Sequence, residues 1–137
     1  MALITAPYLS PRYIFKGIKV SATCTKSSTV NLDVYIDPAI YPYGAYCNGA
    51  KLITKNAEFG DSIIIQCVDK DNVTGYGAGT VLGQYCDWYV DPTGSQESVL
   101  EYGDLIPPYF YMRLIYTSVG TVNDVNVFTN FFMHQLD

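Results

Sequence analysis

Residues 29–36 read Thr-Val-Asn-Leu-Asp-Val-Tyr-Ile, the most regular stretch of the chain. Apolar side chains at 30, 32, 34 and 36 alternate with Asn31, Asp33 and Tyr35. A period of two is typical of a β-strand with one buried face and one wet face. Asp37-Pro38 follows, and proline ends a strand because it cannot donate to the hydrogen-bond ladder. This stretch therefore predicts a strand in a sheet that packs one face on a hydrophobic core and exposes the other face to solvent.

Similar patterns lie on both sides of this segment. Residues 63–65 are three consecutive isoleucines, apolar on both faces, so the strand at 62–68 is expected in the interior of a sheet. Residues 118–123 are expected to form a hairpin loop, and no segment has a helical pattern. Besides 30–36, the expected strands are residues 13–25, 51–54, 62–68, 81–90, 99–102, 109–117 and 124–134.

Seven or eight short strands with turn residues between them predict an all-β fold, an antiparallel β-sandwich or jelly roll. The length of 137 residues fits one domain. We expect that domain at residues 13–137, preceded by an N-terminal arm at 1–12. Half of the chain is hydrophobic (49%), which is enough for a sizeable core and argues against intrinsic disorder.

Charge and targeting patterns narrow the classes of partner. The formal net charge is −5 with only eight Lys and Arg, which argues against binding nucleic acid through its phosphates. The first ten residues lack a basic region, and Pro7 and Pro11 interrupt the apolar stretch, so no secretory signal is expected. No apolar run approaches the roughly 20 residues that span a bilayer. We expect a protein made in a cytoplasm and not embedded in a membrane.

The residues that carry catalysis are scarce. A single histidine, His134, excludes a multi-histidine metal site within one subunit. Residues 75–79 (Gly-Tyr-Gly-Ala-Gly) precede a strand-like segment rather than a helix, so they predict a loop with positive φ angles and a close backbone approach, not a phosphate site. Residues 69–72 (Asp-Lys-Asp-Asn) predict a turn; a calcium loop would need a bidentate Glu where Thr80 stands. We therefore predict no catalytic residue, cofactor or metal, and no enzyme.

Four cysteines occur without a Cys-x-x-Cys pair, so a zinc site is not expected. Cys24 and Cys67 fall in strand patterns and are predicted to pack as small, reduced hydrophobes. The alternative is disulfide formation after release from a reducing cytoplasm. Cys47, in a loop rich in Tyr, Gly and Asn, is the best candidate for an exposed thiol.

The thirteen tyrosines are the most informative residues for function. Tyrosine and tryptophan provide a large, rigid contact area with a polar tip, which suits protein interfaces and sugar stacking. The alternative is that many of them close the ends of a sandwich. The predicted interface residues are Tyr41, Tyr43, Tyr46, Tyr76, Trp88 and Tyr89.

Two segments resemble small structural proteins of tailed bacteriophages. The first is residues 106–120, Ile-Pro-Pro-Tyr-Phe-Tyr-Met-Arg-Leu-Ile-Tyr-Thr-Ser-Val-Gly, with the strand at 124–134. The second runs from Gly60-Asp61 to Gly83 and is similar to uncharacterised phage reading frames. The resemblance covers about half of the chain and implies a β-sandwich virion protein, a head-decoration or cement subunit or a neck or tail component. It carries over no catalytic residue.

The sequence thus predicts a structural subunit of a viral particle, with capsid decoration as the first choice. Its expected partners are other virion proteins and further copies of itself, with no nucleic acid and no membrane. The alternative is a carbohydrate-binding module, free or in a receptor-binding tail component. It would stack a glycan on the loop of Tyr41, Tyr43 and Tyr46 or on a strand that carries Tyr85, Trp88 and Tyr89.

Overall fold

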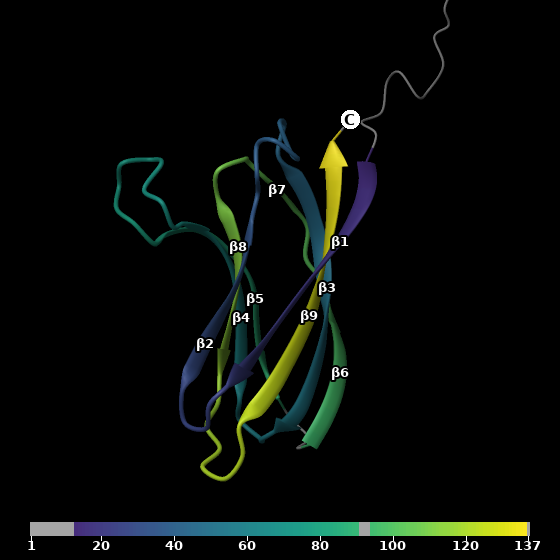
Figure 1. The fold of residues 1–137 in the computed structure, drawn as a ribbon, viewed down its shortest axis with the longest axis vertical. Helices are drawn as coiled ribbons and strands as arrows, with labels where there is room; N and C mark the ends of the chain where they lie inside the picture. Colours follow the sequence, from purple (N-terminus) through teal and green to yellow (C-terminus); the bar gives the residue numbers. More distant parts are fainter. Residues whose placement is uncertain (1–12, 91–93, 137) are drawn as a thin grey trace, which may run out of the picture.

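The computed structural model describes residues 13–90 and 94–136, and the expected arm at 1–12 lies outside the described residues. Two antiparallel sheets lie face to face (Figure 1). The described residues form nine strands: β1 (Tyr13–Cys24), β2 (Thr29–Tyr35), β3 (Ala45–Ala57), β4 (Ser62–Asp69), β5 (Thr80–Tyr89), β6 (Gly94–Leu100), β7 (Asp104–Ile106), β8 (Tyr111–Thr117) and β9 (Val125–Leu136). The prediction of an all-β sandwich is confirmed.

Each sheet combines strands that are distant in sequence. Sheet A has the order β1-β9-β3-β6, with β7 also paired to β3; sheet B has the order β2-β8-β4-β5. The connection at 118–123 runs from β8 in sheet B to β9 in sheet A, so the prediction of a hairpin there is wrong. The strands on either side alternate apolar and polar residues, as the two strands of a hairpin do. This pattern does not indicate to which sheet each strand belongs. Within the described residues, no helix is long and apolar enough to cross a membrane.

The core lies between the two sheets and follows the alternation of the strands. Leu32, Val34 and Ile36 are all at most 5% exposed, as the pattern of residues 29–36 predicts. On β8 and β9, Leu114 and Phe131 are fully buried. β4, which carries the three isoleucines, lies between β8 and β5, so its interior position is confirmed.

Three strands differ from the expectation. The short strand expected at 51–54 is the 13-residue β3, because bulges between Cys47 and Ala50 and between Thr54 and Ala57 interrupt its alternation. β6 begins at Gly94, inside a polar stretch expected to be a loop, and β7 is too short for a period-two pattern to reveal it. These errors all fall where the pairing partner, not the local pattern, defines the strand.

Candidate functional site

The predicted interface residues do not form one patch. Tyr43, Tyr76 and Tyr89 are strongly exposed, by 71, 84 and 62%. Tyr46 is half-buried, with its ring 6.4 Å from that of His134. Tyr41 is 2% exposed and belongs to the core, which corrects the expectation that it presents a contact surface. Trp88 lies in β5, but its side chain lies outside the described residues.

The expected sugar-stacking surfaces are not assembled either. The loop around Tyr41 places that ring in the core, and Tyr85 packs against the core, stacked on Tyr102 at 5.7 Å. Both tyrosines pack with the core, Tyr85 from the middle of the edge strand β5 rather than at an end of the sandwich. A glycan platform at these two places is therefore contradicted for Tyr41 and Tyr85.

All four cysteines are free thiols. Cys24 and Cys67 are buried, which confirms the prediction that they pack as hydrophobes. The prediction for Cys47 is wrong: it lies in β3, is fully buried, and its sulfur lies 3.4 Å from that of Met133. Burial raises the pKa of the Cys47 thiol to about 12, so it is protonated and unreactive at neutral pH. The signal that could have shown this is parity, since Cys47 shares a face with Ala45 on β3.

The β4–β5 connection, residues 70–79, projects beyond the two sheets (Figure 1). It is internally bonded: the carboxylate of Asp69 accepts hydrogen bonds from the backbone N–H groups of Val73 and Thr74 at 2.7 and 3.0 Å. The Asn72 side chain accepts another from the N–H of Gly77 at 2.8 Å. The predicted turn and positive φ angles are confirmed, at 82°, 134° and 85° for the three glycines. The expected close approach of another backbone is absent at these glycines.

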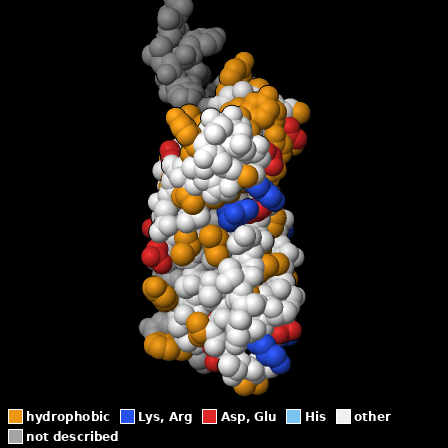
Figure 2. Space-filling model, turned by 90° about the vertical axis from the view of Figure 1, so that its left-hand side faces the viewer, with side chains coloured by type: hydrophobic (Ala, Val, Ile, Leu, Met, Phe, Trp, Pro, Cys, Tyr) orange, Lys and Arg blue, Asp and Glu red, His pale blue; other side chains and the backbone are white. Residues whose placement is uncertain are grey.

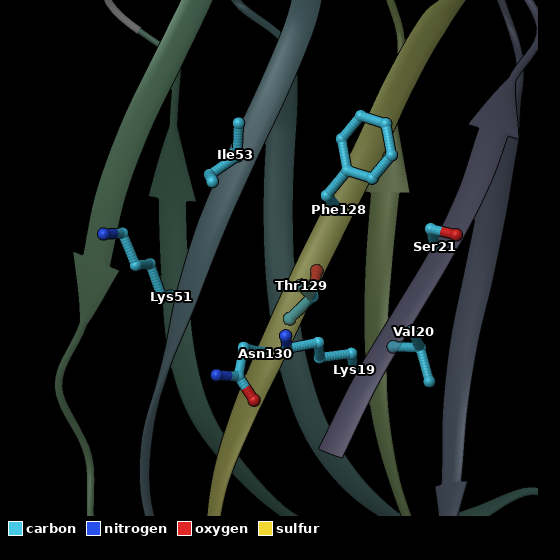
Figure 3. A pocket seen from close by; sticks show the side chains of 8 residues that line it. All are labelled: Lys19, Val20, Ser21, Lys51, Ile53, Phe128, Thr129 and Asn130. Carbon is cyan, nitrogen blue, oxygen red and sulfur yellow. The ribbon is translucent and has the colours of Figure 1, made fainter. Parts of the chain in front are cut away.

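The outer face of sheet A carries a shallow hollow, here called the sheet-A pocket (Figure 3). Its volume is about 460 Å³, and it lies across β1, β9 and β3. The strand register aligns Ser21, Phe128 and Ile53 in one row and Lys19, Asn130 and Lys51 in the next. Phe128 is 49% and Ile53 42% exposed, so two large apolar side chains stand next to each other on a wet face. The lining residues are Lys19, Val20, Ser21, Lys51, Ile53, Phe128, Thr129 and Asn130.

The polar side chains of the sheet-A pocket are two lysines, two hydroxyl groups and one amide. Lys19 reaches from β1 across β9 towards Asn130, whereas Lys51 points towards β6 (Figure 3). The Oδ1 atom of Asn130 is buried and has no hydrogen-bond partner within the described residues. β1, β3 and β9 together contain four lysines and neither Asp nor Glu, in a chain with 13 acidic residues. The pocket thus offers apolar contact and positive charge.

The outer face of sheet B has a closed network of charges instead. Arg113 donates two hydrogen bonds to the Asp33 carboxylate, at 2.7 and 2.9 Å, and Lys70 donates a third at 3.1 Å. Partial burial tends to raise the pKa of Asp33, but the hydrogen bonds from Arg113 and Lys70 outweigh it and lower the pKa below its usual value. In Figure 2, which looks onto this side, basic side chains gather around an acidic one.

An aromatic pair that the sequence analysis did not select lies beside this network. The rings of Tyr35 and Tyr111 are 4.8 Å apart, and the Lys70 ammonium lies 5.1 Å from the Tyr111 ring centre. The Tyr111 hydroxyl donates to Asp71 at 3.0 Å. Both tyrosines stand at outward positions of their strands, but only the β2–β8 register shows that they are direct partners.

The described residues contain no group of three His, Cys, Asp or Glu side chains that could hold a metal ion. The buried carboxylates have structural partners: Asp69 organises the 70–79 loop, and Asp61 accepts hydrogen bonds from the Tyr116 hydroxyl and the Val119 N–H. Among the described residues, the sheet-A pocket and the 70–79 loop both present large apolar side chains to solvent, Ile53 and Phe128 in the pocket and Val73 and Tyr76 in the loop.

No family model and no curated protein sequence matches this chain. Among solved structures, dimeric latent PorU from Porphyromonas gingivalis is similar at a TM-score of 0.52 and 10% identity, over 90% of this chain and 13% of the PorU chain. At that identity the similarity shows a shared β-fold only.

Weaker similarities are to a structure of infectious bursal disease virus, Gx strain (TM-score 0.42, 12% identity, 91% of this chain and 32% of the other), and to Bacillus endospore appendages, described as disulfide-linked pili (0.38, 15% identity, 92% of each chain). TM-scores this low support no conclusion about function.

Proposed function

We propose that this chain is a non-enzymatic structural subunit of a viral particle that binds neighbouring protein subunits, with decoration of a capsid as its specific role. The observation that carries the proposal is the sheet-A pocket, where Ile53 and Phe128 stand exposed on the outer face of a sheet. Adjacent large apolar side chains at the centre of a sheet face favour a protein contact, because they lose contact with water only when a partner covers them.

Two further observations support the proposal. The buried carboxylates and thiols of the described residues serve packing and turn formation rather than a reaction centre. The resemblance of residues 106–120 to structural proteins of tailed bacteriophages supports a place in a virus particle. A compact β-sandwich with a pre-shaped projecting loop suits repeated contacts in a lattice.

Quantitative mass spectrometry of density-purified particles from the producing culture tests this proposal. A decoration subunit is expected at a copy number comparable to that of the major capsid protein. A copy number near that of a portal or tail protein would overturn decoration but keep a virion role. Absence of the chain from particles would overturn both.

A variant of the pocket tests whether that surface makes the contact. Phe128→Ser is expected to reduce incorporation into particles while the chain remains folded by circular dichroism. Val122→Ser is the matched control, because Val122 is 71% exposed in the 118–123 loop, away from the pocket. Equal incorporation of the two variants would exclude the sheet-A pocket as the contact.

A second candidate function, carbohydrate binding, is favoured by the exposed aromatic side chains around the Tyr35–Tyr111 pair. Tyr109 is 48% and Tyr35 36% exposed, beside the charged network of Asp33 and Arg113. Aromatic faces with nearby hydrogen-bonding groups are suited to stacking a sugar. A saturable change of fluorescence on titration with glycans, lost in Tyr35→Ala, would favour this function over the structural one.

A further inference from the structure

We propose that the sheet-A pocket binds an acidic segment of a different protein, one that presents an apolar side chain between carboxylates. The inference rests on the proposed function and names the chemistry of the partner at that contact. A nucleic acid, an anionic membrane and a second copy of this chain are the competing occupants, and each gives a different experimental result.

The outer face of sheet A places cations on both sides of an apolar centre. In the strand register, Ile53 of β3 lies opposite Phe128 of β9. The next row on one side contains Lys19 and Lys51, as Figure 3 shows, and the next row on the other side contains Lys55. Neighbouring rows are two residues apart along a strand, which is about 7 Å. A partner side chain that packs on the apolar centre therefore has lysines close to it in both strand directions.

Two of these lysines have no partner within the subunit. Lys19 and Lys55 are exposed, and neither takes part in a hydrogen bond or an ion pair within residues 13–90 and 94–136. On sheet B, by contrast, Lys70 and Arg113 both pair with Asp33. Unpaired ammonium groups attract carboxylates and repel cations, so they select a partner by its charge, whereas burial of the apolar centre supplies affinity.

The charge of the whole chain favours a protein over a polyanion. The formal net charge is −5, from 13 acidic and 8 basic residues. A nucleic acid or an anionic membrane carries a dense array of negative charge, which the subunit as a whole repels. The positive charge of sheet A is local, since β1, β3 and β9 contain four lysines and neither Asp nor Glu. A protein segment with carboxylates on either side of one apolar side chain needs only this local charge.

Two surfaces of a second copy match this face poorly. The loop that exposes Val73 and Tyr76 has no charged residue from 72 to 79, so it offers no carboxylate to Lys19 or Lys55. Two copies that stacked their sheet-A faces on each other would bring lysine rows together, and like charges repel. These two contacts between copies therefore lack the negative charge that a separate acidic protein supplies.

An NMR titration of the full chain with two short peptides tests the chemistry of the partner. The acidic probe is Gly-Glu-Asp-Phe-Asp-Glu-Gly, and the matched control probe has lysine at each acidic position. The acidic probe is expected to shift the amide signals around Ile53 and Phe128, whereas the lysine probe leaves them unchanged, because only carboxylates pair with the ammonium groups. No shift with the acidic probe, equal shifts with both probes, or shifts confined to other surfaces would overturn the inference.

Charge-reversal variants test the residues. Lys19→Glu and Lys55→Glu are each expected to weaken binding of the acidic probe by about threefold or more, because each replaces an attraction by a repulsion. Lys26→Glu is the matched control, since Lys26 is exposed in the turn between β1 and β2. Circular dichroism checks that all three variants are folded. An equal effect of the control, or tighter binding of oligothymidine or phosphatidylserine vesicles than of the acidic probe at the same face, would contradict the assignment.

Carbodiimide cross-linking of purified particles tests the contact in place, because this reagent joins a lysine to a carboxylate that touches it. Lys19 and Lys55 are expected to be joined to Asp or Glu residues of another virion protein. Cross-links of these lysines to copies of this chain alone, or none from either lysine, would overturn the inference. A chain absent from particles overturns the proposed function and leaves the titration to decide the inference, whereas a chain present in particles that ignores the acidic probe overturns the inference alone.

Discussion

The outward side chains of the two sheets differ in whether they contact one another. On sheet B, the charged and aromatic side chains of β2 and β8 bind one another: Asp33 accepts from Arg113 and Lys70, and Tyr35 contacts Tyr111. On sheet A, Ile53 and Phe128 stand exposed, and the Oδ1 atom of Asn130 has no partner within residues 13–90 and 94–136.

This difference indicates which face is completed inside the chain. A face whose charges are already paired gains little from a partner, because binding would have to remove water from groups that are satisfied. A face with exposed apolar side chains gains from being covered, because a partner removes those side chains from water. We therefore expect substitutions on sheet B to change the stability of the subunit and substitutions on sheet A to change its association.

The largest expected effect is on the free energy of unfolding and comes from removing the arginine of sheet B. Removing a lysine of sheet A is the comparison. Arg113→Met leaves the Asp33 carboxylate, of which 16% of the side chain is exposed, without its bidentate partner and should lower the free energy of unfolding by about 2 kcal/mol. Lys19→Met, an exposed site on sheet A, should change it by about 0.5 kcal/mol or less. Urea denaturation of both variants measures the contrast, and equal effects would contradict it.

Acid denaturation is expected to sharpen the same contrast. Because the folded pKa of Asp33 lies below its unfolded value, its ion pair stabilises the subunit above the unfolded pKa, near 3.8, and that stability is lost as the pH falls through the folded pKa. Asp33→Asn should therefore be less stable than wild type at pH 7, with the difference shrinking below about pH 4.

The Asp33→Asn variant is still expected to lose stability in acid, because Asp69 also has a lowered pKa. Burial tends to raise the pKa of Asp69, but hydrogen bonds from Thr74, Val73 and Asn72 outweigh it and lower that pKa. Urea denaturation of the wild type and of Asp33→Asn at a series of pH values between 2 and 7 gives the free energy of unfolding of each protein as a function of pH. A constant difference between variant and wild type over that range would show that Asp33 does not titrate in this way.

The smallest expected effect is the loss of one exposed hydrogen bond on sheet B. Tyr111→Phe removes the donor to Asp71 while keeping the ring contact with Tyr35, and should cost about 0.5 kcal/mol of stability. Tyr43→Phe, at an exposed hydroxyl, is the control and should be neutral within error. Thermal unfolding followed by circular dichroism compares them, and a larger loss in the control would contradict the assignment.

The strands and their buried side chains were predictable from the sequence wherever a strand has one solvent-exposed and one buried face. The alternation at 29–36 specifies which side chains enter the core, because side-chain direction has a fixed period of two along a strand. The three isoleucines at 63–65 are apolar on both faces and indicated instead that their strand lies in the interior of a sheet. β3 was only partly predictable, since its two bulges shift the parity within one strand.

The candidate site was less predictable. Exposed aromatics at 43, 76 and 89 were expected, but Tyr41 was assigned to the surface because a loop rich in Tyr, Pro and Gly gives no periodic signal. The sheet-A pocket was not expected at all. Each of its two rows takes one residue from β1, β9 and β3. These strands are far apart in the sequence, and nothing in their local patterns indicates that they are neighbours in the sheet.

By itself, the sequence determined the fold class, the buried parity of most strands, the turn chemistry of residues 69–80 and the lack of close Cys pairs. These properties follow from local periodicity and from the conformational preferences of single residues. Only the tertiary structure decided which strands share a sheet, which tyrosines are exposed and where apolar and basic side chains meet. Those outcomes depend on long-range pairing, in which the order β1-β9-β3 places residues 19, 130 and 51 in one row.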